Sequence, residues 1–277
     1  MITIVTDSSS YFKEAEALQM GLRIVPINYM VNNKAYLESF SDYNIGFESL
    51  LEHSTKMSTS QPNSSAFLKC FEEEAEKNNE ILCITLSSRL SGTYSAACAA
   101  AKQIGGQGIA VFDSRLIAGG LYLLITRANQ LIKAGHKLTD IIPLLEQIRG
   151  KISITFSVGN IDPLRRSGRI GFVRMNAETI LNVKPVLQVK EGAVVLSGMA
   201  RGSANLAKKL LHAVDANASE VVINYIGEGR LATNLYHILE TNYPNLPVSL
   251  RKGGPVLGIQ LGLNAIAVSF VRMENQQ

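Results

Sequence analysis

The first half of the chain alternates short apolar runs with segments of helical spacing, and this alternation limits the fold more than any other feature. The runs that predict strands are 2–5, 22–29, 81–86 and 108–112, and the segments that predict helices are 12–20, 47–55, 67–78, 94–104 and 117–134. Strands that are joined through helices pair in parallel through right-handed crossovers. We therefore expect a Rossmann-like α/β domain with a parallel sheet over residues 1–150.

Past residue 151 the pattern changes. The runs 184–190 and 193–199 are joined by Lys190-Glu191-Gly192, which is typical of a hairpin turn. The remaining expected elements are helices at 203–214 and 231–241 and strands at 221–226, 247–250 and 265–271. Hairpins mixed with helices predict an α+β domain with a largely antiparallel sheet over residues 151–277, which would close over a ligand held by the first domain.

Composition excludes several classes of protein. Apolar residues make up 46% and charged residues 18%, so the chain can bury a core and is not disordered. The 27 Lys and Arg residues against 23 Asp and Glu give a net charge of +4, without the dense basic stripe of a nucleic-acid binder. Apolar runs fall far short of a membrane span, and the N-terminus lacks a signal peptide's basic start. We expect a soluble, cytoplasmic protein without stable membrane insertion.

Neither cysteine nor histidine usage indicates a metal site. The cysteines are Cys70, Cys83 and Cys98, with no CxxC pair among them. The four histidines are scattered along the chain. We therefore interpret the cysteines as small buried apolar residues, and we expect neither a metal nor a cofactor.

Hydroxyl-bearing residues collect where predicted strands end. The segments 6–10, 87–93 and 113–114 each follow a strand, and a fourth cluster, 58–65, precedes a helix. The carboxyl edge of a parallel sheet is where such folds bind ligands. Free N–H groups at a helix start, with Ser and Thr hydroxyls, favour a carboxylate or phosphate, and Gly92 would let the backbone approach it closely.

Each cluster alone is also explained as a helix cap, because Ser, Thr and Asp are preferred N-caps. Several clusters at one sheet edge favour an oxyanion site. An enzyme is less well supported, since no His lies in these loops and neither GxSxG nor GxxxxGK[ST] occurs. As an alternative, Asp7 or Asp113 would hold a metal in an enzyme subunit that acts on a small phosphorylated metabolite. The pattern alone predicts an oxyanion-binding two-domain α/β protein.

Positive charge gathers early in the second half. Residues 151–210 contain ten Lys and Arg against three Asp and Glu. The arginines of this region are Arg165, Arg166, Arg169, Arg174 and Arg201. A solvated face is the commoner explanation for such charges, and a docking surface for an acidic or phosphate-bearing partner is the functional one. Phe172 is the one aromatic residue interleaved with these arginines, and such sparse aromatic content argues against nucleic acid.

The order of motifs along the whole chain resembles the DegV family of bacterial fatty-acid-binding proteins, which present an acyl chain to a fatty acid kinase. No single motif is specific, but their combination is. The matching segments are Thr6–Ser10, Val25-Pro26, Thr59–Pro62, Leu90–Tyr94, Phe112–Ser114, Gly119-Gly120, Leu164–Ile170, Leu181–Leu187 and Gly254–Gly258.

The resemblance implies a long-chain fatty acid buried between the two domains and no catalytic residue. By position, Thr59 and Ser91 would hydrogen-bond the carboxylate, with the Gly92 backbone beside it. Ser60, Ser8 and Gln260 complete the ligand site that we predict. A lipid-binding or regulatory module without a kinase is the alternative.

The resemblance also implies partner contacts. Arg169 and Arg201 match family arginines, and Arg201 lies where the kinase is expected to dock. The chain departs from the family near its C-terminus, where a His-x-Gly-Pro-Gly segment is replaced by Gln260-Leu-Gly-Leu-Asn264. Glutamine donates a hydrogen bond, but it cannot carry a charge or relay a proton.

Overall fold

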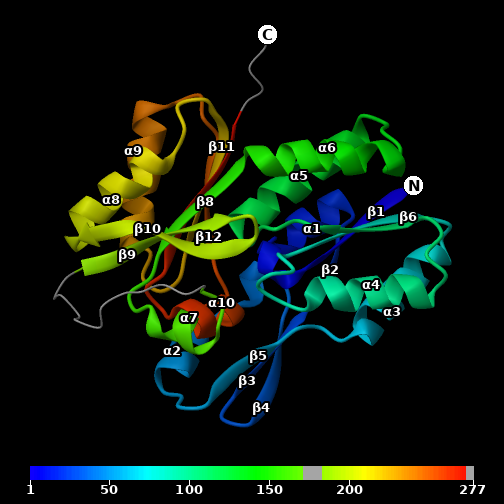
Figure 1. Cartoon of the computed structure of the whole chain (residues 1–277), viewed down its shortest axis with the longest axis horizontal. Helices are drawn as coiled ribbons and strands as arrows, with labels where there is room; N and C mark the ends of the chain where they lie inside the picture. The colour runs from blue at the N-terminus through cyan, green and yellow to red at the C-terminus, as the bar shows by residue number, and fades with distance from the viewer. Residues whose placement is uncertain (171–182, 273–277) are drawn as a thin grey trace.

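A four-stranded parallel sheet forms the first layer of the protein. The computed structural model describes residues 1–170 and 183–272 (Figure 1). The strands of this sheet lie in the order β2 (Arg23–Val25), β1 (Ile2–Asp7), β6 (Glu80–Thr85) and β7 (Ile109–Asp113). Every neighbouring pair is parallel, as the alternation of strands and helices predicts.

Helices cover both faces of this sheet. The helices of this half are α1 (Glu14–Met20), α2 (Phe47–Glu52), α3 (Ser64–Ala75), α4 (Thr93–Gln103), α5 (Gly119–Lys133) and α6 (Leu138–Lys151), with a short 3-10 turn, η1 (Ser8–Ser10). Alternate residues of β6 face opposite sides. Ile81 and Cys83 pack with α3 and α4, whereas Leu82 and Ile84 belong to the cluster that contains α5. Both faces are therefore buried, as is usual for parallel strands.

A six-stranded sheet forms the second half. Its order is β10 (Ala193–Arg201), β9 (Val183–Lys190), β8 (Ile152–Ser157), β13 (Ile266–Arg272), β11 (Ala218–Tyr225) and β12 (Val248–Lys252). Only the β11–β12 pair is parallel, so the sheet is largely antiparallel, as expected. Helices α8 (Gly202–Ala213) and α9 (Arg230–Asn242) cover its outer face. None of the helices in the described ranges has both the length and the apolar character to cross a bilayer.

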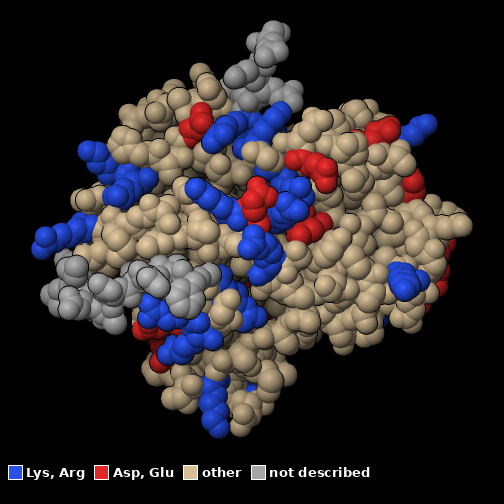
Figure 2. All heavy atoms as spheres, viewed as in Figure 1, with Lys and Arg blue, Asp and Glu red and all other residues tan. Residues whose placement is uncertain are grey.

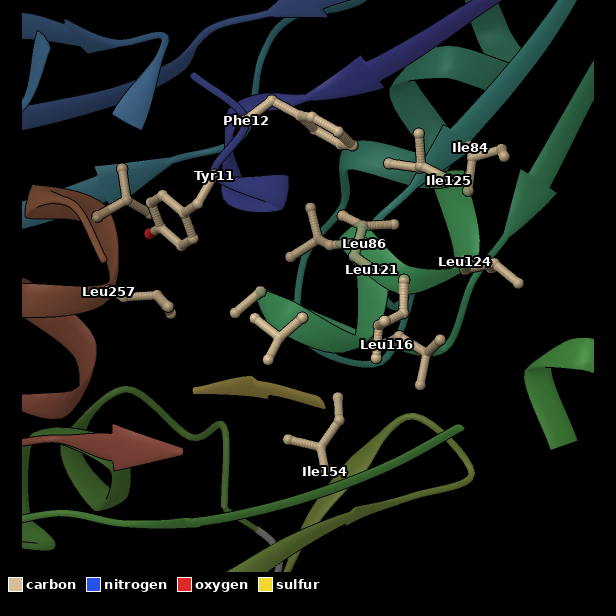
Figure 3. Packing of buried hydrophobic residues seen from close by; sticks show 14 of the residues in the cluster. Tyr11, Phe12, Ile84, Leu86, Leu116, Leu121, Leu124, Ile125, Ile154 and Leu257 are labelled. Atoms are coloured by element: carbon tan, nitrogen blue, oxygen red, sulfur yellow. The ribbon is translucent and has the colours of Figure 1, made fainter. Parts of the chain in front are cut away.

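Helix α5 lies between the two sheets. It packs against β8, β11 and β13 on one side and against β1 and η1 on the other. Leu121, Leu124 and Ile125 are fully buried, and Figure 3 shows them among side chains from both sheets, including Ile84 and Ile154. Residues 119–125 of α5 are apolar on every side and form the shared core of both halves, whereas Gln130 and Lys133 near its end are exposed.

A small antiparallel sheet, which the sequence pattern did not predict, lies beside the larger two. It contains β4 (Lys34–Glu38), β3 (Ile27–Val31) and β5 (Met57–Ser60) in that order. The single strand predicted over 22–29 is wrong, because it divides at Pro26 into β2 and β3 in different sheets. Proline has no N–H to donate to a ladder and fixes its own φ, so the chain changes direction there.

Other elements were also absent from the prediction. They are α6, β8, β4, β5, α7 (Asp162–Arg166) and α10 (Pro255–Leu261). Helix α6 carries Pro143 in its interior. Strand β8 begins directly after α6, and the glycine nearest the junction, Gly150, lies inside the last turn of the helix instead of separating the two elements. The shortest of these elements are held by tertiary packing rather than by local propensity.

The predicted hairpin is confirmed, and its turn reaches the first half of the molecule. Glu191 and Gly192 both have positive φ values, 45° and 79°, as a tight two-residue turn requires. The Ser87 hydroxyl donates to the Gly192 carbonyl at 2.7 Å, and Arg115 pairs with Glu191 at 2.8 Å. The division into domains near residue 150 stays a prediction, since α5 and this turn connect the two sheets.

Gly119 allows α5 to approach the six-stranded sheet closely. A Cβ atom at this position would lie 2.5 Å from Asn224 Oδ1 and 2.9 Å from the side chains of Ser269 and Val222. The Gly119 N–H donates to Asn224 Oδ1 at 2.8 Å. Close packing thus explains the glycine at position 119, the first of the Gly119-Gly120 pair in the family motif.

We predict that Gly119→Ala lowers the free energy of unfolding by about 1–3 kcal/mol, because the new methyl group overpacks the contact between helix and sheet. Gly150→Ala in α6 is the matched control, since its Cβ would meet no atom within 4 Å. That substitution should raise stability slightly through helix propensity. Equal effects of the two substitutions in urea unfolding would contradict the packing argument.

Candidate functional site

A pocket lies where the three sheets and α10 meet. The empty space between its walls is about 1110 Å³ when the solvent at its open mouth is included. The residues that line it from the first half are Ser9, Ile27, Thr59, Ser60, Gln61, Leu86, Leu90, Ser91, Ile117 and Ala118. Those from the second half are Ile154, Phe156, Leu164, Arg169, Val189, Val194, Asn224, Tyr225, Ile226, Gly253, Val256, Leu257, Gln260, Leu261, Ala265, Ile266 and Ala267.

Most of this lining is apolar. The walls from the six-stranded sheet and α10 carry aliphatic and phenyl groups, such as Phe156, Val194 and Leu257. Arg169 is the one charged side chain among the described residues that line the pocket, and no Asp or Glu is among them. Such a pocket suits a ligand with a long apolar body and a single anionic group.

Polar side chains collect at one part of the lining. Gln260 Nε2 lies 2.7 Å from Thr59 Oγ1, which joins α10 to β5. Gln260 Oε1 is buried and has no hydrogen-bond partner. The Ser91 and Thr93 hydroxyls lie 2.8 Å apart at the start of α4. Gln260 Oε1 is an acceptor, so a ligand satisfies it only with an O–H or N–H donor, whereas an anion must be bound through Gln260 Nε2.

Gly92 brings the start of α4 against Gln61. It is the N-cap of α4, and a Cβ there would lie 2.7 Å from Gln61 Nε2. Gln61 lines the pocket, but the sequence analysis did not single it out. The sequence feature that could have indicated Gln61 is its position inside the hydroxyl cluster at 58–65. Because Gly92 has no side chain, the loop that carries Ser91 can lie against the chain that follows β5.

Arg169, which the sequence analysis assigned to partner docking, lines this same pocket. Its Nε donates to the Leu90 carbonyl at 3.4 Å, next to Ser91. Arg201 is exposed at the end of β10 and does not line the pocket. On the face drawn in Figure 2, Lys and Arg gather over the second-half elements labelled in Figure 1. Arg174 and the first two residues of the 181–187 motif lie outside the described residues.

Ser8 is placed differently from the other predicted ligand residues. It is fully buried in η1 and does not line the pocket. Its hydroxyl donates to Glu38 Oε1 at 3.2 Å and accepts from the Ile27 N–H. The Ser9 hydroxyl similarly donates to Asp7 Oδ1 at 2.5 Å. The first hydroxyl cluster therefore holds the loop together through buried carboxyl groups.

The two aspartates considered as metal ligands also organise loops. Asp7 accepts from the Leu86 N–H at 2.8 Å, and Asp113 accepts from the N–H groups of Ser88 and Arg115 at 3.0 Å. Burial raises the pKa of Asp7, while its hydrogen bonds oppose that shift. Within the described ranges, His, Cys, Asp and Glu form no group of three or more that could hold a metal.

Glu38 is the most perturbed carboxyl group near the pocket. It is 0% exposed at the end of β4. Burial raises its pKa to about 8, although hydrogen bonds from the Val256 N–H and Ser8 lower it. Burial therefore favours the uncharged form of this carboxyl group.

The chain is similar along nearly its whole length to curated bacterial proteins. It is 29% identical over 276 residues to a DegV domain-containing protein of Halalkalibacterium halodurans, covering 97% of this chain and 98% of the relative. It is 26% identical over 278 residues to the protein DegV of Bacillus subtilis, covering 97% and 98%.

Solved structures share the fold. A DegV family protein from Thermus thermophilus, described as binding fatty acid, has a TM-score of 0.86 and 28% identity, covering 98% of this chain and 99% of that one. A DegV family protein from Eubacterium eligens, loaded with heptadecanoic acid, has a TM-score of 0.84 and 21% identity, covering 99% and 100%. The latter likeness shows the fold alone.

The family comparison covers nearly the whole sequence. The family described as "Uncharacterised protein, DegV family" matches residues 1–273. The parallel sheet, the largely antiparallel sheet and the motif order agree with that match. This chain belongs to the DegV family.

Proposed function

We propose that this protein binds a long-chain fatty acid in the pocket and presents its carboxylate to a partner fatty acid kinase, with no catalytic activity of its own. The observation that carries the proposal is the lining: apolar walls, a cluster of hydroxyl and amide groups, and Arg169 as the charged residue. The fatty-acid binding described for the Thermus thermophilus relative supports it. We propose the cytoplasm as its place of action.

The apolar walls would supply most of the binding free energy. Each buried CH₂ group contributes roughly 0.8 kcal/mol, so a long acyl chain binds tightly even when its head group contributes little. Chain burial would therefore set affinity, and the polar cluster would set orientation.

The polar cluster would hold the carboxylate. Hydroxyl groups of Thr59 and Ser91 donate without adding charge, and the Gln260 amide can donate beside them. Arg169 would supply the positive charge, since a guanidinium group binds a carboxylate through two parallel hydrogen bonds. We therefore place Arg169 in the head-group site and leave Arg201 to partner docking.

The first test is mass spectrometry of the freshly purified protein, in its native state and after organic extraction. We expect a stoichiometric adduct that extracts as a fatty acid. A protein without an adduct that also takes up none of the common fatty acids would overturn the proposal. Small phosphorylated metabolites would then be the compounds to screen.

We predict that Ser91→Ala weakens fatty-acid binding roughly tenfold, because a hydrogen bond to a charged group is lost. Ser88→Ala is the matched control in the same loop. Its hydroxyl donates to Asp113 Oδ2 at 2.5 Å, and it does not line the pocket. Isothermal titration should separate the two, and an unchanged affinity of Ser91→Ala would exclude the carboxylate role.

Presentation to a kinase depends on access to the head group. Ser60 and Gln61 are exposed, whereas Thr59, Ser91 and Gln260 are half-buried. The carboxylate would thus lie near the pocket mouth. The family pattern has a histidine where this chain has Gln260, and glutamine cannot relay a proton.

We predict that Gln260→His increases phosphorylation of the bound fatty acid by a partner kinase while fatty-acid affinity stays within a few-fold. Both quantities are to be measured on the same loaded protein. Unchanged phosphorylation with binding intact would favour a lipid-binding module that is not coupled to a kinase at this position.

A further inference from the structure

Glu38 is a buried carboxyl group that the proposed function does not use. It lies in β4, paired with Ile27 of β3, and is absent from the pocket lining. No solvent reaches it, since its exposed fraction is 0%. Burying a carboxyl group away from water and cations costs free energy of folding.

Those contacts connect three separate parts of the chain. Glu38 Oε2 accepts from the Val256 N–H in the first turn of α10 at 2.9 Å. Its other oxygen, Oε1, accepts from the Ser8 hydroxyl at 3.2 Å. A Cβ atom at Gly254 would lie 2.2 Å from Oε2, so the chain just before α10 runs directly against the carboxyl group.

Helix α10 is thereby attached to the small sheet at two points. Glu38 of β4 holds its first turn, and Thr59 of β5 contacts Gln260 in its last turn at 2.7 Å. The helix also packs directly on β3 and β5. Because Gln260 follows Val256 by four residues, about one helical turn, a shift of the first turn displaces the amide from the head-group cluster.

The groups around Glu38 are not cationic. The titratable groups that face it are Asp7, Tyr11 and Tyr29. None of the ion pairs found within the described ranges includes Glu38. Figure 3 shows the Tyr11 ring pointing toward the helix that carries Leu257. Without a cation to compensate a negative charge, the uncharged form of this carboxyl group is favoured, and an amide can imitate that form.

We propose that Glu38 is a positioning residue for the head-group site: it holds the first turn of α10 on the small sheet and so places Gln260 beside Thr59. This inference rests on the proposed function. We therefore expect the loss of Glu38 to weaken binding of the carboxylate more than binding of the acyl chain.

The test compares two ligands of equal chain length, a fatty acid and the corresponding fatty alcohol. Glu38→Ala should reduce the preference for the acid over the alcohol roughly tenfold, as expected for a lost hydrogen bond to a charged group. Glu38→Gln should retain the preference, because its amide oxygen can accept from the Val256 N–H. Gly254→Ala should reproduce the loss from the α10 side. An unchanged preference in Glu38→Ala would overturn the proposal.

Glu74→Ala is the matched control for removal of a buried glutamate. Glu74 is 3% exposed and contacts Thr3, Arg23 and Lys77, outside the pocket. It should lower stability without changing the preference for the acid. Adding Glu38→Ala to Gln260→Ala should cause no further loss of preference. A further loss would show that Glu38 does not act through Gln260.

Hydrogen exchange tests the contact between Glu38 and Val256 without any fatty acid, so it separates this proposal from the proposed function. In Glu38→Ala, the amide of Val256 should exchange faster than in the wild-type chain, whereas α9 amides should not change. If the wild-type chain binds no fatty acid, the proposed function fails while the contact is still tested by exchange. Unchanged exchange at Val256 would overturn the positioning role. Should Glu38→Ala fail to fold, Gly254→Ala provides the same exchange test.

Discussion

The burial of the first two turns of α5 on all sides is the constraint on which the rest of the structure depends. Leu121, Leu123, Leu124 and Ile125 point in different directions around the helix, and each is fully buried. No single sheet can cover such a helix, so one sheet must lie on each side. Gly119, at its start, permits close contact with the six-stranded sheet. The two sheets therefore face each other across α5, and the pocket forms beside its first turn.

The polar groups around this pocket divide into two kinds. Carboxyl groups hold loops: Asp7 binds the Ser9 hydroxyl, Asp113 binds that of Ser88, and Glu38 binds that of Ser8. Apart from Ser9, the hydroxyl and amide groups that line the pocket have no carboxyl partner. This division keeps negative charge out of the lining, as an anionic ligand requires.

Strong local patterns were predicted well, and weak ones were not. Alternating strands and helices predicted the parallel sheet, and Glu191-Gly192 predicted the hairpin turn. The three-stranded sheet was missed because Pro26 interrupts one apolar run and β5 consists mainly of small polar residues. Helix α10 has seven residues, too few to be stable without its neighbours.

The same distinction holds for the site. Thr59, Ser60, Ser91, Arg169 and Gln260 all line one pocket, so the fold brings together residues that the loops and motifs singled out. Ser8 belongs to a hydroxyl cluster that also predicted an anion site, but its hydroxyl donates to the buried Glu38. Nothing local to the cluster distinguishes it from the loop that holds Ser91. The difference depends on which strand packs beside each loop.

The sequence by itself determined that hydroxyl groups collect at one sheet edge, because parallel strands separated by helices all end at that edge. Only the tertiary structure decided which hydroxyl groups are available to a ligand. Glu38 reaches Ser8 across 30 residues, and Gln260 reaches Thr59 across 201. Contacts over such separations arise from packing of whole elements around α5, and no local pattern of residues encodes them.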